Sequence, residues 1–197
     1  RHIVLGIDRA GFVGEDGETH HGLFDVAMLT TVPGVTVYSP SDTAELSQCL
    51  EQALYKDKGI VAVRYPRGCE LYRSGTKAYS DFRYVSNKNR KLIFTYGRIS
   101  AYAYTIHGVD ILQAIKIFPI ADEIIDICLA YDEIYAFEEG EREGGIAQKL
   151  CTALALAGFK GRFTITAVDG FVRHADVATQ LHNAMLDADG MRKITGE

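Results

Sequence analysis

Residues 3–22 read IVLGIDRAGFVGEDGETHHG, and this stretch decides the fold. Its first part, residues 3–7, is a short apolar run that predicts a buried strand. The loop that follows, residues 8–22, holds an arginine, several acids, two adjacent histidines and four glycines. Proteins of the α/β class build their sites in such loops, at the carboxyl ends of strands. The stretch therefore predicts an α/β fold whose function lies in this loop.

The composition excludes several classes of protein. The chain has 197 residues, of which 47% are hydrophobic and 24% charged, and these are ordinary values for a folded chain of one large or two small domains. The net charge of −5 offers no electrostatic reason to expect nucleic acid or an anionic membrane as a partner. No apolar run reaches the length of a membrane span, and we expect a cytoplasmic protein.

The four cysteines predict no metal or redox site. Cys49, Cys69, Cys128 and Cys151 are far apart, without the close spacing of a zinc site or a CxxC motif. Cys49, Cys128 and Cys151 lie among apolar residues of predicted helices, so we expect them to be buried and reduced. Cys69 follows a Pro-Arg-Gly turn and is expected to be more exposed.

Strands and helices alternate along the chain, which predicts two Rossmann-like three-layer units with mostly parallel sheets. We expect one unit over residues 1–75, a linker over 76–90 with one strand near 82–85, and a second unit over 91–197. Strands are predicted over 3–7, 35–38, 60–64, 91–96, 109–117, 133–138 and 163–168, and helices over 21–30, 121–129, 144–156 and 176–186. Only about a dozen residues separate the strand that ends at Tyr96 from the one at Val109, so a helix there must be very short, or residues are absent.

A further helix is predicted to begin after Asp42. Asp42 is the expected N-cap, and Glu45 three residues later completes a capping box. The apolar spacing predicts one buried face made of Leu46, Cys49, Leu50, Ala53 and Leu54.

Arg9 and Arg67 form the first pair of candidate site residues. Each follows a predicted strand and lies close to a glycine. Neighbouring parallel strands would bring both guanidinium groups to one edge of the sheet, where they could bind a phosphate or carboxylate. The alternative is that each arginine makes a structural ion pair with an acid such as Asp8 or Glu15.

Asp16 and His20 form the second pair. If the helix opens at residues 19–22, His20 lies near its N-terminus, where the dipole favours a neutral ring that exchanges protons near neutral pH. Asp16 could orient that ring or bind a substrate hydroxyl. The alternative is a capping aspartate beside a surface histidine. The adjacent His21 is the weaker candidate.

A second acidic, glycine-rich loop follows the strand predicted over 133–138. Its Glu138-Glu139-Gly140 and Glu143-Gly144-Gly145 segments are expected to serve packing or a subunit contact. We expect His107, His174 and His182 at the surface or an interface. The sequence contains no dinucleotide fingerprint, P-loop or nucleophile elbow.

Four blocks of the first half together resemble the 1-deoxy-D-xylulose-5-phosphate synthase family. They are DRAG at 8–11, GEDGETHHGLFD at 14–25, SPSD at 39–42 and RYPRG at 64–68, and their order resembles the pyrimidine-binding domain of that family. In the second half, TYGR at 95–98, IFPI at 117–120 and the acids and glycines of 138–145 more loosely resemble its C-terminal domain. The resemblance implies that residues 1–75 are the C-terminal part of a pyrimidine-binding domain and 91–197 a transketolase C-terminal domain.

The resemblance also implies a function. The family uses thiamine diphosphate and Mg²⁺ to condense pyruvate with D-glyceraldehyde 3-phosphate into 1-deoxy-D-xylulose 5-phosphate. This product is a precursor of isoprenoids, thiamine and pyridoxal. The resemblance also implies a homodimer. Arg9 and Arg67 match arginines that hold the phosphate of the acceptor substrate. Asp16 matches an acid that contacts substrate hydroxyls, and His20 a histidine that hydrogen-bonds substrate or relays a proton.

The sequence departs from the family in one major respect. The family's GDG-to-Asn motif for the diphosphate and Mg²⁺ is missing, and its catalytic glutamate and stacking aromatic lie upstream of residue 3. We therefore expect a C-terminal fragment that is inactive by itself, with no metal site and with its cofactor-binding residues unassigned. Two alternatives stay open: a transketolase-like subunit completed by a partner chain, and a non-catalytic phosphate-binding or assembly module.

Overall fold

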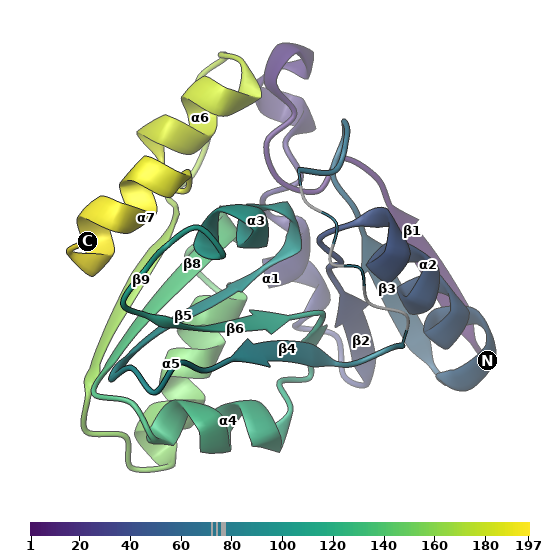
Figure 1. Cartoon of the computed structure of the whole chain (residues 1–197). Helices are drawn as coiled ribbons and strands as arrows, with labels where there is room; N and C mark the ends of the chain where they lie inside the picture. The colour runs from purple at the N-terminus through teal and green to yellow at the C-terminus, as the bar shows by residue number, and fades with distance from the viewer. Residues whose placement is uncertain (72, 74, 76–77) are drawn as a thin grey trace.

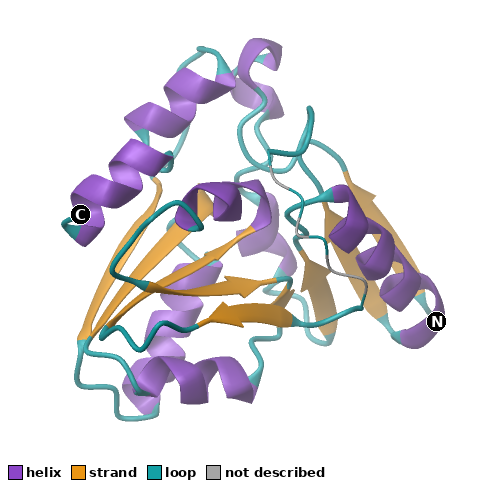
Figure 2. Cartoon of the chain, viewed as in Figure 1, coloured by secondary structure: helices purple, strands orange, loops and turns teal. Residues whose placement is uncertain are grey.

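The strands form two sheets in the computed structural model, which describes residues 1–71, 73, 75 and 78–197 (Figure 2). The first sheet has the order β1 (Ile3–Ile7), β3 (Ile60–Arg64), β2 (Val35–Tyr38) and β7 (Lys116–Phe118). The second has the order β4 (Phe82–Val85), β6 (Asp110–Ala114), β5 (Lys91–Tyr96), β8 (Glu133–Glu141) and β9 (Arg162–Val168). Only the edge strands β7 and β4 pair antiparallel within these sheets. The predicted α/β class with mostly parallel sheets is confirmed.

Helices cover both faces of the second sheet (Figure 1). One face packs against α4 (Asp122–Leu129) and α5 (Ile146–Leu156), and the other against α3 (Ser100–Ala103), α6 (Val177–Asn183) and α7 (Ala188–Thr195). In the first unit, α1 (Asp25–Leu29) and α2 (Thr43–Glu51) lie on opposite faces of the first sheet. The predicted three-layer arrangement is therefore present, and α7 is a helix that the sequence analysis missed.

The two sheets share one hydrophobic core. Val35, Val37 and Ala62 of the first sheet lie in the same buried cluster as the residues of β5, β8, α4 and α5. On the opposite face of the first sheet, Cys49 and Ala53 pack against β3. Burial of apolar area is the main stabilising contribution, so the first part depends on the second to cover one face of its sheet.

The segment 109–117, predicted as a single strand, is divided between the two sheets. Its first part is β6 of the second sheet, and its end belongs to β7 of the first sheet. The division falls at Ile115, where the N–H groups of Ile115 and Lys116 both donate to the Asp81 carbonyl at 2.8 and 2.9 Å. Ser39 N–H in turn donates to the Ile115 carbonyl at 2.8 Å. These tertiary hydrogen bonds replace the ladder that would have continued one strand.

The predicted linker contains the expected strand, β4, which pairs with β6. Residues 76 and 77 at the start of that linker lie outside the described residues. The division of the chain into domains at 75 and 91 stays a prediction.

The strand β1 is present as predicted, but it is not buried. Ile3 is 47% exposed and Leu5 38% exposed. In the described part of the chain β1 pairs with β3 alone, so it is the edge of its sheet. A strand at the edge of a sheet has side chains that solvent can reach, whereas neighbours cover those of a central strand. The prediction that this apolar run is buried is therefore wrong.

The helix after Asp42 is confirmed, but its buried face ends early. The Asp42 carboxylate accepts the Glu45 N–H at 2.8 Å as the N-cap, while the Glu45 carboxylate accepts the N–H of Ser41, one residue before the expected partner, at 2.7 Å. From Gln52 to Lys56 the helix widens into a π-helix. The widening changes the angle between successive side chains, so Ala53 stays buried while Leu54 is 49% exposed.

Other local predictions are confirmed with small changes. The connection after β5 holds only a 3₁₀ turn, Gly97–Ile99, and the four residues of α3. All four cysteines are free thiols; Cys49 and Cys128 are buried and Cys69 is exposed. Cys151 is only half-buried, because it lies at the margin of the packed face of α5. No helix among the described residues is long and apolar enough to cross a membrane.

Candidate functional site

The parallel pairing of β1 with β3 brings Arg9 and Arg67 to one place. Ile7 lies opposite Arg64 at the ends of these strands, so the chain segments that follow them emerge side by side. The two guanidinium groups contact one carboxylate: Arg9 Nε donates to Asp16 Oδ2 at 3.0 Å, and Arg67 Nη1 donates to Asp16 Oδ1. Three of the four predicted site residues therefore form one cluster.

The cluster is accessible and charged. The side chains of Arg9 and Arg67 are 46% and 49% exposed, and that of Asp16 is 21% exposed. The hydrogen bond from Arg67, followed by the charges of both arginines, lowers the pKa of Asp16, which is therefore a carboxylate at neutral pH. A second acid, Asp8, lies 4.0 Å from Arg9 Nη1. Both arginines therefore make ion pairs, which was the alternative to ligand binding, but the partner that they share is Asp16 and not Asp8 or Glu15.

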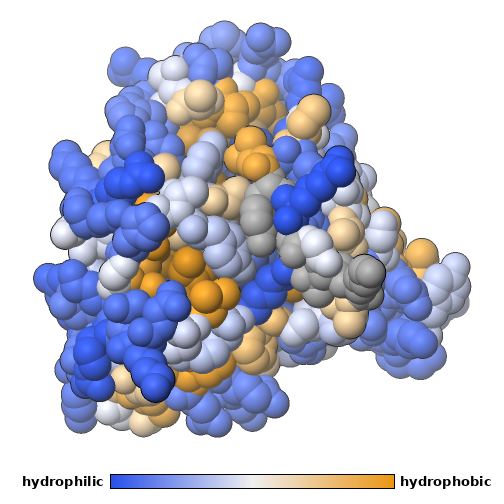
Figure 3. Space-filling view, in the orientation of Figure 1, coloured by the Kyte–Doolittle hydropathy of each residue, from blue (hydrophilic) through white to orange (hydrophobic). Residues whose placement is uncertain are grey.

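A hollow of about 240 Å³ adjoins this cluster. Arg67 and Glu15 line one side of it, and Asp176 and Val177 at the start of α6 line the other. In Figure 1 the loop of residues 8–22, in purple, rises beside this end of α6. The face shown in Figure 3 is mostly hydrophilic, with apolar side chains confined to small areas. Of the two arginines, Arg67 lines this hollow directly, and Arg9 lies beside it across Asp16.

His20 is in the same loop but outside the cluster. It is exposed, lies in the 3₁₀ turn Glu18–His20, and its Nδ1 is 3.1 Å from Thr19 Oγ1. The predicted place at a helix N-terminus is wrong, because α1 begins only at Asp25. The intervening Gly22 is held by tertiary hydrogen bonds, so the backbone there is unable to join the helix.

His21, the weaker candidate, is buried and stabilises the loop through contacts within it. Its Nδ1 accepts the Val13 N–H at 3.1 Å, and its ring meets Phe12 edge to face with centroids 5.7 Å apart. Burial lowers the pKa of His21, which favours the neutral ring that this hydrogen bond requires.

Two glycines close the base of the loop. Gly11 and Gly22 exchange backbone hydrogen bonds of 2.8 and 2.9 Å. A Cβ on Gly22 would lie 2.3 Å from the Arg9 carbonyl oxygen, so no side chain fits there. The buried Arg64 donates to the Gly22 carbonyl at 3.0 Å and to both carboxylate oxygens of Asp25 at 2.9 and 3.1 Å. The loop is thus fixed at its base while its tip stays exposed.

The acidic pair at the end of β8 serves packing, as predicted, but it also reaches the loop. Glu138 accepts the N–H groups of Ile146 and Ala147, at 2.9 and 2.8 Å, at the start of α5. Glu139 accepts the Phe12 N–H at 2.8 Å and pairs with Arg98. The sequence does not predict this contact, because no local pattern joins residues 127 positions apart. The role of this region in a subunit contact stays a prediction.

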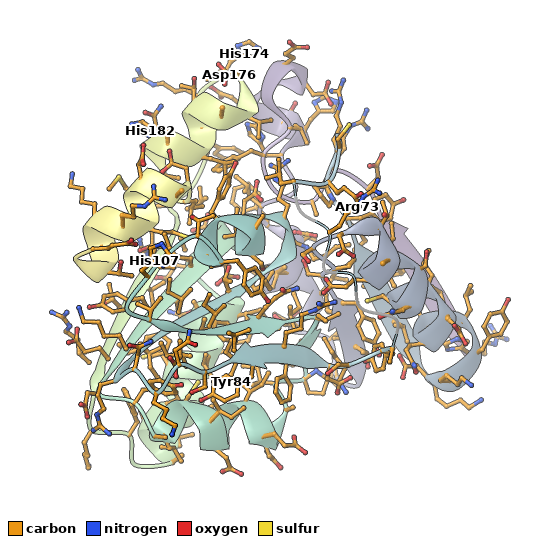
Figure 4. The ribbon with its side chains drawn as sticks, viewed as in Figure 1. Arg73, Tyr84, His107, His174, Asp176 and His182 are labelled. Carbon is orange, nitrogen blue, oxygen red and sulfur yellow. The ribbon has the colours of Figure 1, made fainter. Side chains whose placement is uncertain are left out.

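Three further histidines, predicted at the surface or an interface, are exposed. His107, His174 and His182 are exposed, and Figure 4 shows His174 and His182 along the outer side of the C-terminal helices. His182 Nδ1 lies 2.8 Å from Asp187 Oδ2. Within the described ranges, no three His, Cys, Asp or Glu side chains gather in a way that could hold a metal ion.

The chain is similar to proteins of known family. Residues 1–70 match the family model described as transketolase, pyrimidine binding domain. The fold is similar to a solved structure described as split gene transketolase, inactive beta4 tetramer, with a TM-score of 0.77 and 17% identity. That similarity covers 95% of this chain and 63% of the other, and at this identity it supports the fold alone.

Curated sequence relatives are more specific. The 1-deoxy-D-xylulose-5-phosphate synthase of Chlorobium luteolum is 33% identical over 100% of this chain and 33% of its own length. The synthases of Thermus thermophilus and Chlorobaculum tepidum are 32% and 34% identical over 97% and 96% of this chain, each over 32% of its own length. The chain thus spans about a third of the length of these relatives.

The fold is transketolase-like, and residues 1–70 match the pyrimidine-binding domain of that class. Within that class, the relatives show that the chain is a 1-deoxy-D-xylulose-5-phosphate synthase-like segment.

Proposed function

We propose that this chain supplies the acceptor-substrate side of a 1-deoxy-D-xylulose-5-phosphate synthase. In this proposal Arg9 and Arg67 bind the phosphate of D-glyceraldehyde 3-phosphate. Asp16 holds the two guanidinium groups in place and contacts a substrate hydroxyl, and His20 hydrogen-bonds substrate or relays a proton. The observation that carries the proposal is the meeting of two half-exposed arginines around one carboxylate, at the carboxyl ends of paired parallel strands.

The chemistry of the cluster supports a phosphate ligand. Guanidinium groups bind phosphate through charge-assisted, bidentate hydrogen bonds, and each arginine has donors beyond the one given to Asp16. The carboxylates of Asp16 and Asp8 offset the two guanidinium charges, so the free N–H donors of the arginines, more than net charge, would bind the phosphate. The loop base, closed by Gly11 and Gly22, keeps Arg9 near the β3 side of the site.

The cofactor belongs to the same proposal. Thiamine diphosphate with Mg²⁺ would supply the carbanion chemistry on the pyruvate-derived donor. The proposed part of this chain is limited to the acceptor, because the family's motif for the diphosphate and Mg²⁺ is missing from its sequence. We also propose a homodimer in the cytoplasm, on the strength of the family resemblance alone.

The decisive experiment is a comparison of two arginine variants in the full-length protein. Arg67→Ala should raise KM for glyceraldehyde 3-phosphate by about 10- to 100-fold, since a hydrogen bond to a charged group contributes roughly 1.5–3 kcal/mol, and it should leave KM for pyruvate nearly unchanged. Arg73→Ala is the matched control, because Arg73 is an exposed arginine six residues away that pairs with Glu70. Equal increases for both substrates in Arg67→Ala would contradict the phosphate role.

A second candidate is a transketolase-like subunit that a partner chain completes. The open edge of β1, with Ile3 and Leu5 exposed, is the observation that favours it. An added strand could pair there. Activity that appears only on mixing with a second polypeptide would support this candidate over the first.

A further inference from the structure

Phe12 is held by two buried charged side chains from the other part of the molecule. Its N–H donates to Glu139 Oε1 at 2.8 Å, and its carbonyl accepts from Arg98 Nη2 at 2.7 Å. Arg98 follows β5 and Glu139 lies on β8, so both come from the second sheet. The side chains of Arg98 and Glu139 are each 7% exposed, and Phe12 is fully buried.

The two side chains also bind each other. Arg98 Nε donates to Glu139 Oε2 at 2.9 Å, and Arg98 Nη2 donates to Glu139 Oε1. Together they satisfy both backbone polar groups of one loop residue, an arrangement we call the Phe12 clamp. A buried ion pair is costly to desolvate and is weak evidence for stability. Its specific consequence here is geometric: it determines where the loop backbone lies.

The neighbouring residue shows how closely the loop approaches the clamp. Gly11 has φ +79°, and a Cβ there would lie 2.4 Å from the Glu139 carboxylate. Phe12 is three residues after Arg9 and four before Asp16. The Gly11–Gly22 pair holds the Arg9 side of the loop, so a displacement of Phe12 would change how Asp16 meets Arg9 and Arg67.

We propose that Arg98 and Glu139 are positioning residues, which hold the loop so that Arg9 and Asp16 face Arg67 in the geometry that binds the phosphate of the acceptor. This inference rests on the proposed function for its effect on the substrate. The position of the loop itself does not depend on that function.

The first test measures the loop directly, in the full-length protein, by amide hydrogen exchange. Because Glu139→Gln alone would leave Arg98 buried and unpaired, the main variant is the double substitution Arg98→Met with Glu139→Met, which removes both charges and both hydrogen bonds to Phe12. We expect exchange of the peptide covering residues 10–21 to accelerate by about tenfold or more, with β5 and β8 unchanged. Unchanged exchange in this peptide would overturn the inference.

The second test separates positioning from general stability. The double variant should raise KM for glyceraldehyde 3-phosphate about tenfold or more and leave KM for pyruvate unchanged, because a small misplacement of binding groups is costly only for the ligand they bind. Glu138→Gln is the matched control: it alters a buried acid next to Glu139 that contacts the start of α5 instead of the loop. It should change neither the amide exchange of the loop nor the KM ratio, meaning the KM for glyceraldehyde 3-phosphate divided by the KM for pyruvate.

The outcomes distinguish the two proposals. If Arg67→Ala shows no selective effect on glyceraldehyde 3-phosphate while the loop exchange accelerates in the double variant, the phosphate role fails and the clamp on the loop stands. If Arg67→Ala is selective but the double variant changes neither exchange nor the KM ratio, the positioning role is overturned. The positioning role is also overturned if Arg67→Ala is selective and the double variant exchanges faster in the loop but keeps the KM ratio unchanged.

Discussion

At the residue scale, the central feature is one carboxylate between two arginines. Asp16 is bound by Arg9 and Arg67, which come from segments that follow different strands. An exposed ion pair by itself contributes little to stability, because solvent screens it and both side chains lose freedom. Under the proposed function, Asp16 keeps two mutually repelling guanidinium groups close together for the phosphate of the acceptor.

The pKa of Asp16 provides a test at this scale. The hydrogen bond from Arg67 is the largest cause that lowers this pKa below its usual value of 3.8. The stabilising effect of the carboxylate is therefore present above this usual value, which holds in the unfolded chain, and is lost as the pH falls through the lower folded pKa. Titration by carboxyl NMR should show the pKa of Asp16 rise toward its usual value in Arg67→Ala and stay low in Arg73→Ala. An unchanged pKa in Arg67→Ala would show that the contact is absent in solution.

At the scale of the element, the loop of residues 8–22 is held by tertiary contacts. Its base is closed by Gly11 and Gly22, and its middle is held by His21 and the Phe12 clamp. The loop has little regular structure beyond two short 3₁₀ turns, so its conformation depends on these contacts.

Gly22→Ala tests that dependence. A Cβ at this position would lie 2.3 Å from the Arg9 carbonyl oxygen and 2.9 Å from Ala10 Cα, so the backbone must shift. We expect the free energy of unfolding to fall by about 1–3 kcal/mol, the usual cost of overpacking, as measured by urea denaturation. Gly6→Ala is the control, because the nearest atom to its Cβ would be Tyr65 Oη at 3.8 Å. Equal stability of the two variants would show that the loop base tolerates a side chain.

At the scale of the whole molecule, the two sheets are joined more closely than two domains on a linker. The segment from β6 to β7 gives one strand to each sheet, and the cluster containing Val35, Val37 and Ala62 continues into the second sheet. A separate first unit would lose an edge strand and one covered face of its sheet.

This continuity predicts the behaviour of the separated parts. Residues 1–75 expressed alone should be unfolded, because their apolar face toward the shared core would be exposed to water. Residues 78–197 should keep a folded five-stranded sheet, since their helices cover both faces. The ¹H–¹⁵N correlation spectrum of each piece decides the matter; well-dispersed signals from residues 1–75 would show an independent domain.

Much of the fold follows from local patterns in the sequence. Runs such as 3–7 and 60–64 predict strands because their apolar, β-branched composition suits extended backbone, and Asp42 predicts a helix start because its side chain caps the backbone directly. Arg9 and Arg67 could be placed together from the sequence, since neighbouring parallel strands end at the same edge. These features depend on neighbours in the chain or on one simple rule of sheet topology.

Other features were decided only by the tertiary structure. The exposure of β1 depends on its place at the edge of the sheet, and the division at Ile115 depends on hydrogen bonds to Asp81 and Ser39. The hydrogen bond from the Phe12 N–H to Glu139 joins residues that are distant in sequence. The sequence by itself determined the class of fold and the residues of the candidate site. Only packing between distant segments decided how the loop that carries them is held, because contacts between such segments leave no periodic signal in the chain.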